Sequence, residues 1–158
     1  MIEEWWNIPE LIEVRENFFL PEKRLFDLDN LIPSNGDRKV EYNLRTPRSL
    51  PSALDEAVQF VCDETKTLYT TAILKYYYPG KDSWAYKKHK DPKRFMNGPL
   101  FLCTLRWEAI FSVWDQKWVK YDYEAIPNNM MLVNPKLDHQ VSRPQTSEYR
   151  SLLFLGVE

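Results

Sequence analysis

Two histidines, one aspartate and one arginine are the residues whose types and spacing point to chemistry. His89 and Asp91 form an H-x-D sequence, His139 follows fifty residues after His89, and Arg150 lies eleven residues beyond His139. Two imidazoles and one carboxylate can hold one face of an Fe(II) ion and leave three coordination positions open. Thiolates would instead favour zinc or iron–sulfur sites. The chain contains only two histidines, so this one site accounts for both.

Arg150 begins the last apolar run of the chain, which continues from Ser151 to Leu155. A guanidinium within an apolar strand is costly unless it pairs with an anion. Arginine suits this role because its planar fork binds a carboxylate through two parallel hydrogen bonds. We therefore expect Arg150 to hold the carboxylate of a small-molecule acid.

Short β-like runs must position these residues. After residue 67 the chain alternates apolar or β-branched runs with turn residues, and the runs are 68–78, 83–88, 100–105, 108–114, 117–123, 130–134, 139–143 and 149–157. No helical pattern separates them. This spacing favours a closed or double-sheet antiparallel barrel of eight strands over a fold of alternating strands and helices.

One helix is predicted before these strands. An apolar stripe at helical spacing is formed by Leu54, Ala57, Val58 and Val61. Ser52 is a candidate N-cap, so the pattern predicts a helix over about 52–66. Residues 1–48 show no clean period and are expected to be helical or irregular.

The length of 158 residues suits a single domain. We expect this domain to span 1–158, with 1–48 as an N-terminal extension, 49–67 as a helix packed on the barrel, and 68–158 as the barrel core. The 21 Lys and Arg residues against 23 Asp and Glu give a net charge of -2. This balance excludes nucleic-acid binding through overall positive charge.

The cysteines and the apolar runs bear on location. Cys62 and Cys103 have no metal-binding or disulfide-framework spacing. No apolar run approaches the roughly 20 residues of a membrane span. The segment Met1–Trp6 is acidic, whereas a signal peptide begins with basic residues. We expect a soluble, cytoplasmic protein that does not enter membranes.

The order H-x-D, distal histidine and then arginine on the last strand resembles the 2-oxoglutarate- and Fe(II)-dependent dioxygenases. The resemblance implies a double-stranded β-helix, a mainly β jelly roll of about eight strands. It implies that His89, Asp91 and His139 hold Fe(II) and that these three are the catalytic residues. Arg150 would bind the distal carboxylate of the cosubstrate 2-oxoglutarate, and Tyr77 would donate a hydrogen bond to it. Dioxygen would then oxidise the cosubstrate to succinate and carbon dioxide while the substrate is hydroxylated or demethylated.

Within this superfamily the chain is most similar to the AlkB-like branch, over about residues 46–156. The segment 75–80 corresponds to the strand that precedes H-x-D in that branch, and Ala109–Phe111 corresponds to a later A-x-F strand. The sequence Tyr-x-Pro-Gly, at residues 77–80, also resembles prolyl-hydroxylase-type members.

Three positions depart from the AlkB-like pattern. Lys75 replaces the usual asparagine and shares one face of its strand with Tyr77. Gly156 stands where those enzymes have a second arginine, and Lys93 replaces an acidic residue near the target base. The cofactor residues are unaffected, so the departures bear on base recognition.

Three functions follow from these residues. The first is an AlkB-like oxidation of N-alkyl groups on nucleic acid, and the second is hydroxylation of a protein side chain, as in prolyl hydroxylases, or of a small molecule. The third is a non-catalytic jelly-roll binding module, which Arg150 disfavours because such a module needs no cosubstrate.

Two groups of residues bear on the substrate. A basic rim is formed by Lys81, Lys87, Lys88, Lys90, Lys93 and Arg94. These cations either contact phosphates or lie on a solvated loop. Candidate stacking aromatics are Trp84, Tyr86, Trp107, Trp114 and Trp118. Each of these side chains either stacks on a base or packs in the core and across strands.

Overall fold

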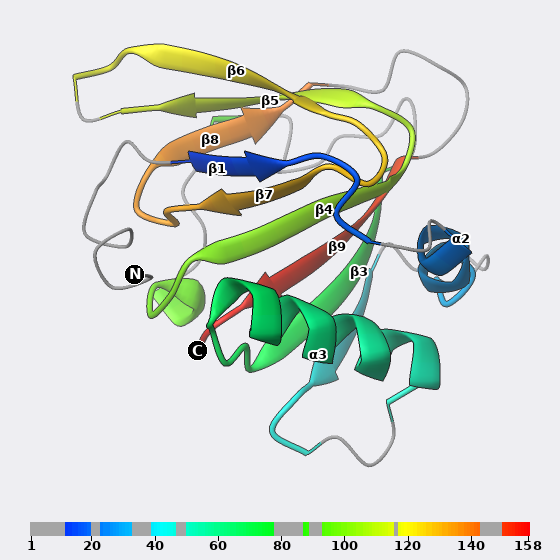
Figure 1. Ribbon diagram of the computed structural model, residues 1–158. Helices are drawn as coiled ribbons and strands as arrows, with labels where there is room; N and C mark the ends of the chain where they lie inside the picture. Colours follow the sequence, from blue (N-terminus) through cyan, green and yellow to red (C-terminus); the bar gives the residue numbers. More distant parts are fainter. Residues whose placement is uncertain are drawn as a thin grey trace.

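A computed structural model of the chain describes residues 12–19, 23–32, 39–46, 50–77, 87–88, 93–115, 117–142 and 150–158. These residues form two antiparallel sheets, one of six strands and one of three. Helices cover the outer face of the larger sheet, and the smaller sheet lies on its other side (Figure 1). This architecture confirms the mainly β, jelly-roll-like fold that the sequence predicts.

The strand order places the last strand near the middle of the larger sheet. That sheet runs β1 (Ile12–Arg15), β7 (Met130–Val133), β4 (Leu100–Arg106), β9 (Arg150–Gly156), β3 (Thr71–Tyr77) and β2 (Lys39–Asn43). The smaller sheet runs β6 (Lys120–Ala125), β5 (Ala109–Trp114) and β8 (Asp138–Val141). The helical elements are α2 (Lys23–Asp29), α3 (Ser52–Thr65) and the 3-10 turn η3 (Lys93–Phe95).

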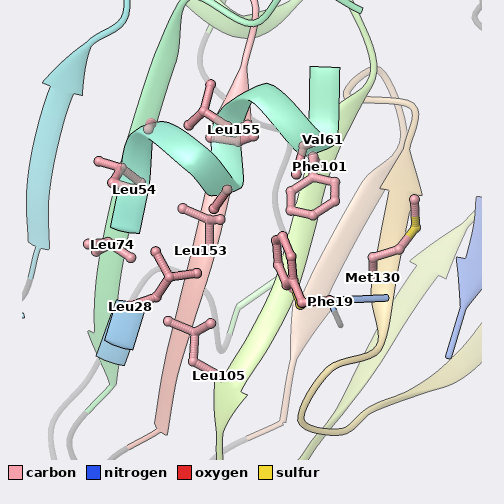
Figure 2. Packing of buried hydrophobic residues seen from close by; sticks show 14 of the residues in the cluster. Phe19, Leu28, Leu54, Val61, Leu74, Phe101, Leu105, Met130, Leu153 and Leu155 are labelled. Carbon is pink, nitrogen blue, oxygen red and sulfur yellow. The ribbon is translucent and has the colours of Figure 1, made fainter. Parts of the chain in front are cut away.

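Successive side chains of β9 enter two different hydrophobic clusters, because side chains alternate across a strand. Leu153 and Leu155 pack against Leu54 and Val61 of α3, in the cluster that Figure 2 shows. Residues 150, 152 and 154 instead face the smaller sheet. The space between the two sheets is therefore lined from β9 by every second residue.

Helix α3 confirms the predicted helix to within one residue at its end. The predicted apolar stripe is buried against the larger sheet. The predicted N-cap is wrong, since the capping position is Pro51 and no side chain caps the helix. The backbone oxygen of Pro51 accepts a hydrogen bond from Asp55 N at 2.9 Å, as the carbonyl of a capping residue does at the start of a helix.

Two strands occur in the segment that was expected to be helical or irregular. β1 pairs with β7, and β2 pairs with β3, so both extend the edges of the larger sheet. Among the described residues of this segment only α2 is helical, and it buries Leu25 and Leu28. The N-terminal part of the chain therefore contributes directly to the sheet that carries β9.

Asn128 connects the N-terminal part to the turn before β7. Its side-chain oxygen accepts a hydrogen bond from Phe19 N at 2.8 Å, and its side-chain nitrogen donates to Phe19 O at 2.9 Å. Its backbone oxygen accepts from Phe18 N at 2.9 Å. Asn128 has a φ of 68°, a conformation that asparagine tolerates better than most residues.

Seven of the eight predicted runs each overlap an observed strand, β3 to β9. Most of the remaining run, 83–88, lies outside the described residues, and Lys87 and Lys88 are not in a strand. In the described ranges, no helix has the length and apolarity that a membrane span requires.

Candidate functional site

A cavity of about 580 Å³, including its open mouth, lies between the two sheets. Its lining includes Tyr77 of β3, His139 of β8 and Arg150 of β9. Residues far apart in the sequence meet here because β3 and β9 are neighbours in the larger sheet while β8 belongs to the smaller one. The fold thus brings three of the predicted site residues to one cavity.

His139 is buried at this cavity, with 5% of its surface exposed. Its ring stacks on that of Phe111, with centroids 5.5 Å apart and an angle of 22° between the planes. Its Nδ1 lies 3.1 Å from Leu137 O. A carbonyl oxygen only accepts, so Nδ1 is the donor in this contact, which leaves Nε2 as the ring nitrogen that can bind a metal. Metal-binding histidines commonly have this arrangement.

Arg150 is buried beside Tyr77 and Thr104. Its Nη2 donates a hydrogen bond of 2.7 Å to Thr104 Oγ1 on β4. Tyr77 lies directly opposite Arg150 in the β3–β9 pair, and the guanidinium carbon is 5.8 Å from the Tyr77 ring centroid. These contacts orient a permanent cation at the cavity, which favours an anionic ligand.

Lys75 also lines the cavity, on the same face of β3 as Tyr77. Its Nζ lies 4.4 Å from the ring centroid of Phe154, a distance at which the ring face attracts the ammonium group. Among the described residues, the cavity lining contains Lys75 and Arg150 but no aspartate or glutamate. The described part of the cavity lining is therefore cationic.

Two of the predicted metal ligands, His89 and Asp91, lie outside the described residues. Within the described ranges, no group of three or more potential metal-binding side chains is found. The structure therefore locates one of the three predicted ligands, His139, and the triad stays a prediction.

The 3-10 turn η3, two residues after Asp91, is held by contacts of Arg94 and Phe95. Arg94 of η3 donates to Glu41 on β2, with Nη2 2.8 Å from Oε2, and to Glu158, with Nη2 2.7 Å from Oε1. The ring of Phe95 packs edge-on against Phe154 at 5.0 Å between centroids. These contacts connect η3 to β2, β9 and the last residue of the chain.

The basic rim is in part engaged within the protein. Lys88 Nζ lies 4.6 Å from the ring centroid of Trp114 and 4.0 Å from that of Trp118, and Arg94 is paired as described. Lys87 and Lys93 are exposed. Lys81 and Lys90 lie outside the described residues, as do the candidate stacking residues Trp84 and Tyr86.

The hairpin that carries Trp118 is ordered by Asp115. Asp115 Oδ1 accepts hydrogen bonds from Val119 N at 2.9 Å and Lys117 N at 2.8 Å, and Oδ2 accepts one from Tyr121 Oη at 3.1 Å. These bonds, led by the one from Val119, lower the pKa of the Asp115 carboxyl below its usual value. The two tryptophans near Lys88 therefore flank a carboxylate that accepts three hydrogen bonds. Of the other candidate aromatics, Trp107 is 39% exposed.

No family model matches the sequence, and no curated protein matches it. Solved structures do match the fold. A prolyl-4-hydroxylase from Pseudomonas putida has a TM-score of 0.69 and 14% identity, with 100% of both chains covered. A prolyl hydroxylase from Trichoplax adhaerens, in complex with a hypoxia inducible factor oxygen degradation domain peptide fragment, has a TM-score of 0.69 and 14% identity over 99% of this chain and 86% of that chain. NgTET1 in complex with 5mC DNA has a TM-score of 0.66 and 13% identity over 93% of this chain and 72% of that chain. At these identities the similarity establishes a shared fold.

Proposed function

We propose that the chain is an Fe(II)- and 2-oxoglutarate-dependent dioxygenase that hydroxylates a protein side chain, as prolyl hydroxylases do. The proposal rests chiefly on one observation: His139, Tyr77 and Arg150 line a single cationic cavity between the two sheets. The fold similarity supports it, because prolyl hydroxylases and TET enzymes are dioxygenases of the superfamily that the H-x-D pattern resembles.

The donor set fits an iron ion. His89, Asp91 and His139 would supply two imidazoles and one carboxylate, the ligands typical of non-haem Fe(II) oxygenases. The hydrogen bond between His139 Nδ1 and Leu137 O gives the ring the tautomer that binds metals through Nε2. When bound, the iron supplies the oxidising chemistry with dioxygen and the cosubstrate.

The protein's own residues bind and orient the cosubstrate. Arg150, held by Thr104, would pair with the distal carboxylate of 2-oxoglutarate, and Tyr77 would donate a hydrogen bond to it. Apolar side chains of the cavity wall, including Phe111, Leu152 and Met131, limit the access of water.

A peptide is the substrate class that these observations favour. Two prolyl hydroxylases match the fold over 99% or more of this chain, one of them in complex with a peptide. Lys88 and Arg94 of the basic rim contact groups within the protein, so fewer cations remain for phosphates. An AlkB-like reaction on nucleic acid is the second candidate, favoured by the similarity to NgTET1 in complex with 5mC DNA.

Metal and cosubstrate binding test the reaction class. Under anaerobic conditions, Fe(II) and 2-oxoglutarate should produce a weak visible charge-transfer band, and oxygen should then release succinate. The variants His89→Ala, Asp91→Ala and His139→Ala should each lose iron binding. A protein that shows neither the band nor succinate release would not be a dioxygenase of this kind.

Succinate release also distinguishes the substrates. A peptide library with proline-containing members should stimulate release, with little dependence on salt. A methylated oligonucleotide should stimulate little; strong, salt-sensitive stimulation that is lost in Lys87→Ala would instead favour the nucleic-acid reaction.

A further inference from the structure

Lys75 and Arg150 occupy neighbouring positions on one face of the larger sheet. In the β3–β9 pair, Tyr77 lies opposite Arg150 and Lys75 lies opposite Leu152. The two cations are therefore diagonal neighbours, separated by two residues along the strands. Diagonal neighbours in an antiparallel pair are roughly 7–8 Å apart.

The charge of Lys75 is directed at the cavity and is not balanced from its own sheet. The residue opposite it on β2 is Lys39, another cation. Glu41, the next residue on that face of β2, is held by Arg94 through hydrogen bonds of 2.8 and 3.3 Å. In the part of the chain that the structure describes, no ion pair joins Lys75 to a carboxylate, and its Nζ lies over Phe154.

A small dicarboxylate offers one acid group to each of the two cations. With carbon–carbon bonds of about 1.5 Å, the terminal carboxyl carbons of an extended five-carbon diacid are roughly 5 Å apart. Lys75 and Arg150 are both long side chains on adjacent strands, so each can donate charge-assisted hydrogen bonds of about 2.8 Å to one of the two carboxylates. A single cation at this cavity would recognise only one end.

We propose that Lys75 binds the carboxylate at the keto-acid end of 2-oxoglutarate, while Arg150 binds the distal one. Lys75 is then a second binding residue for the cosubstrate, and it sets the preference for a dicarboxylate together with Arg150. This inference rests on the proposed function, since it assumes that 2-oxoglutarate occupies the cavity.

Two ligands and two variants separate the roles of the cations. The protein is loaded with Mn(II) without oxygen, and dissociation constants are measured by calorimetry for 2-oxoglutarate and for 2-oxopentanoate, which lacks the distal carboxylate. Lys75→Met keeps the length of the side chain over Phe154 but removes its charge. This variant should raise the dissociation constants of both ligands by the same factor, about tenfold. Arg150→Met should raise the dissociation constant of 2-oxoglutarate alone.

Three controls define the outcome. Lys39→Met removes the exposed cation opposite Lys75 and should leave both constants unchanged, and Lys75→Arg should retain most of the affinity. Circular dichroism establishes that each variant is folded. A loss of affinity below threefold in Lys75→Met, or a loss of affinity for 2-oxoglutarate alone, overturns the role of Lys75. If the unaltered protein does not bind 2-oxoglutarate more tightly than 2-oxopentanoate, the proposed function itself fails.

Discussion

The ring of Phe95 fills the space beside Gly156 in which any other residue would place its Cβ. A Cβ on Gly156 would lie 2.6 Å from Cδ1 of Phe95. Phe95 is itself confined, because it packs against Phe154 and lies under the guanidinium of Arg94, 4.5 Å from the ring centroid. Position 156, where the AlkB-like pattern would have a second arginine, therefore has no room for a side chain in this protein.

Gly156→Ala should lower the free energy of unfolding. The added methyl group meets a buried ring, and overpacking of this kind typically costs about 1–3 kcal/mol. Urea unfolding measures the change. In the double variant Phe95→Leu/Gly156→Ala the smaller side chain makes room, so the two losses should not add. Additive losses would show that the Phe95 ring is not the cause.

Thr104→Val should weaken cosubstrate binding while keeping the shape of the side chain. The variant removes the oxygen that accepts the 2.7 Å hydrogen bond from Arg150 Nη2. Hydrogen bonds to charged groups contribute about 1.5–3 kcal/mol, so the dissociation constant for 2-oxoglutarate should rise about tenfold. Thr104→Ser retains the hydroxyl and serves as the control. Equal affinity in the valine and serine variants would contradict a role for Thr104 in orienting Arg150.

Asp115→Asn should reduce the acid sensitivity of the fold. The pKa of Asp115 is lowered in the folded protein, so its ionised form adds stability above the usual carboxyl pKa of about 4. That stability is lost as the pH falls through the lower pKa of the folded state. Unfolding curves from neutral to acidic pH should therefore converge for the two proteins at low pH. Asp63→Asn, at an exposed position on α3, controls for the loss of one charge, and a constant offset at every pH would contradict the prediction.

Arg94→Gln should weaken metal binding although Arg94 is not a ligand. Arg94 lies three residues after Asp91 and anchors η3 to Glu41 and Glu158. Loss of partners that orient metal ligands commonly lowers metal affinity about 10- to 100-fold. Titration with Mn(II) measures the effect. Lys93→Gln removes a neighbouring exposed charge without these ion pairs, so an equal loss in both variants would indicate a general effect of charge.

Residue type and spacing singled out Tyr77, His139 and Arg150, which line the cavity, but not the other lining residues, and the roles of the three stay predictions. Tyr77 and Arg150 lie at the ends of apolar runs, and His139 begins another run, so alternation along the strands directs all three inward. The seven observed core strands were predictable for the same reason. The relation of His89 and Asp91 to these residues stays a prediction.

Contacts between distant segments were not predictable. Strand β2 has a polar–apolar alternation, Lys39–Asn43, but it is only five residues long and its paired residues on β3 are 28 to 36 positions away. The ion pairs of Arg94 with Glu41 and Glu158 span 53 and 64 positions. No local pattern in the sequence distinguishes an arginine that pairs within the protein from one that can contact phosphates. The sequence alone therefore left both interpretations of the basic rim open.

The hydrogen bonds between Phe19 and Asn128 span 109 positions, and this separation has a consequence for folding during synthesis. Phe18 and Phe19 emerge from the ribosome long before Asn128 and the strand β7 that follows it. At a synthesis rate of about 5–20 residues per second, several seconds or more pass before the native contact of this segment with Asn128 can form. Apolar segments exposed in this way are typical binding sites for chaperones. The yield of folded protein should therefore depend on chaperones more than the stability of the finished fold suggests.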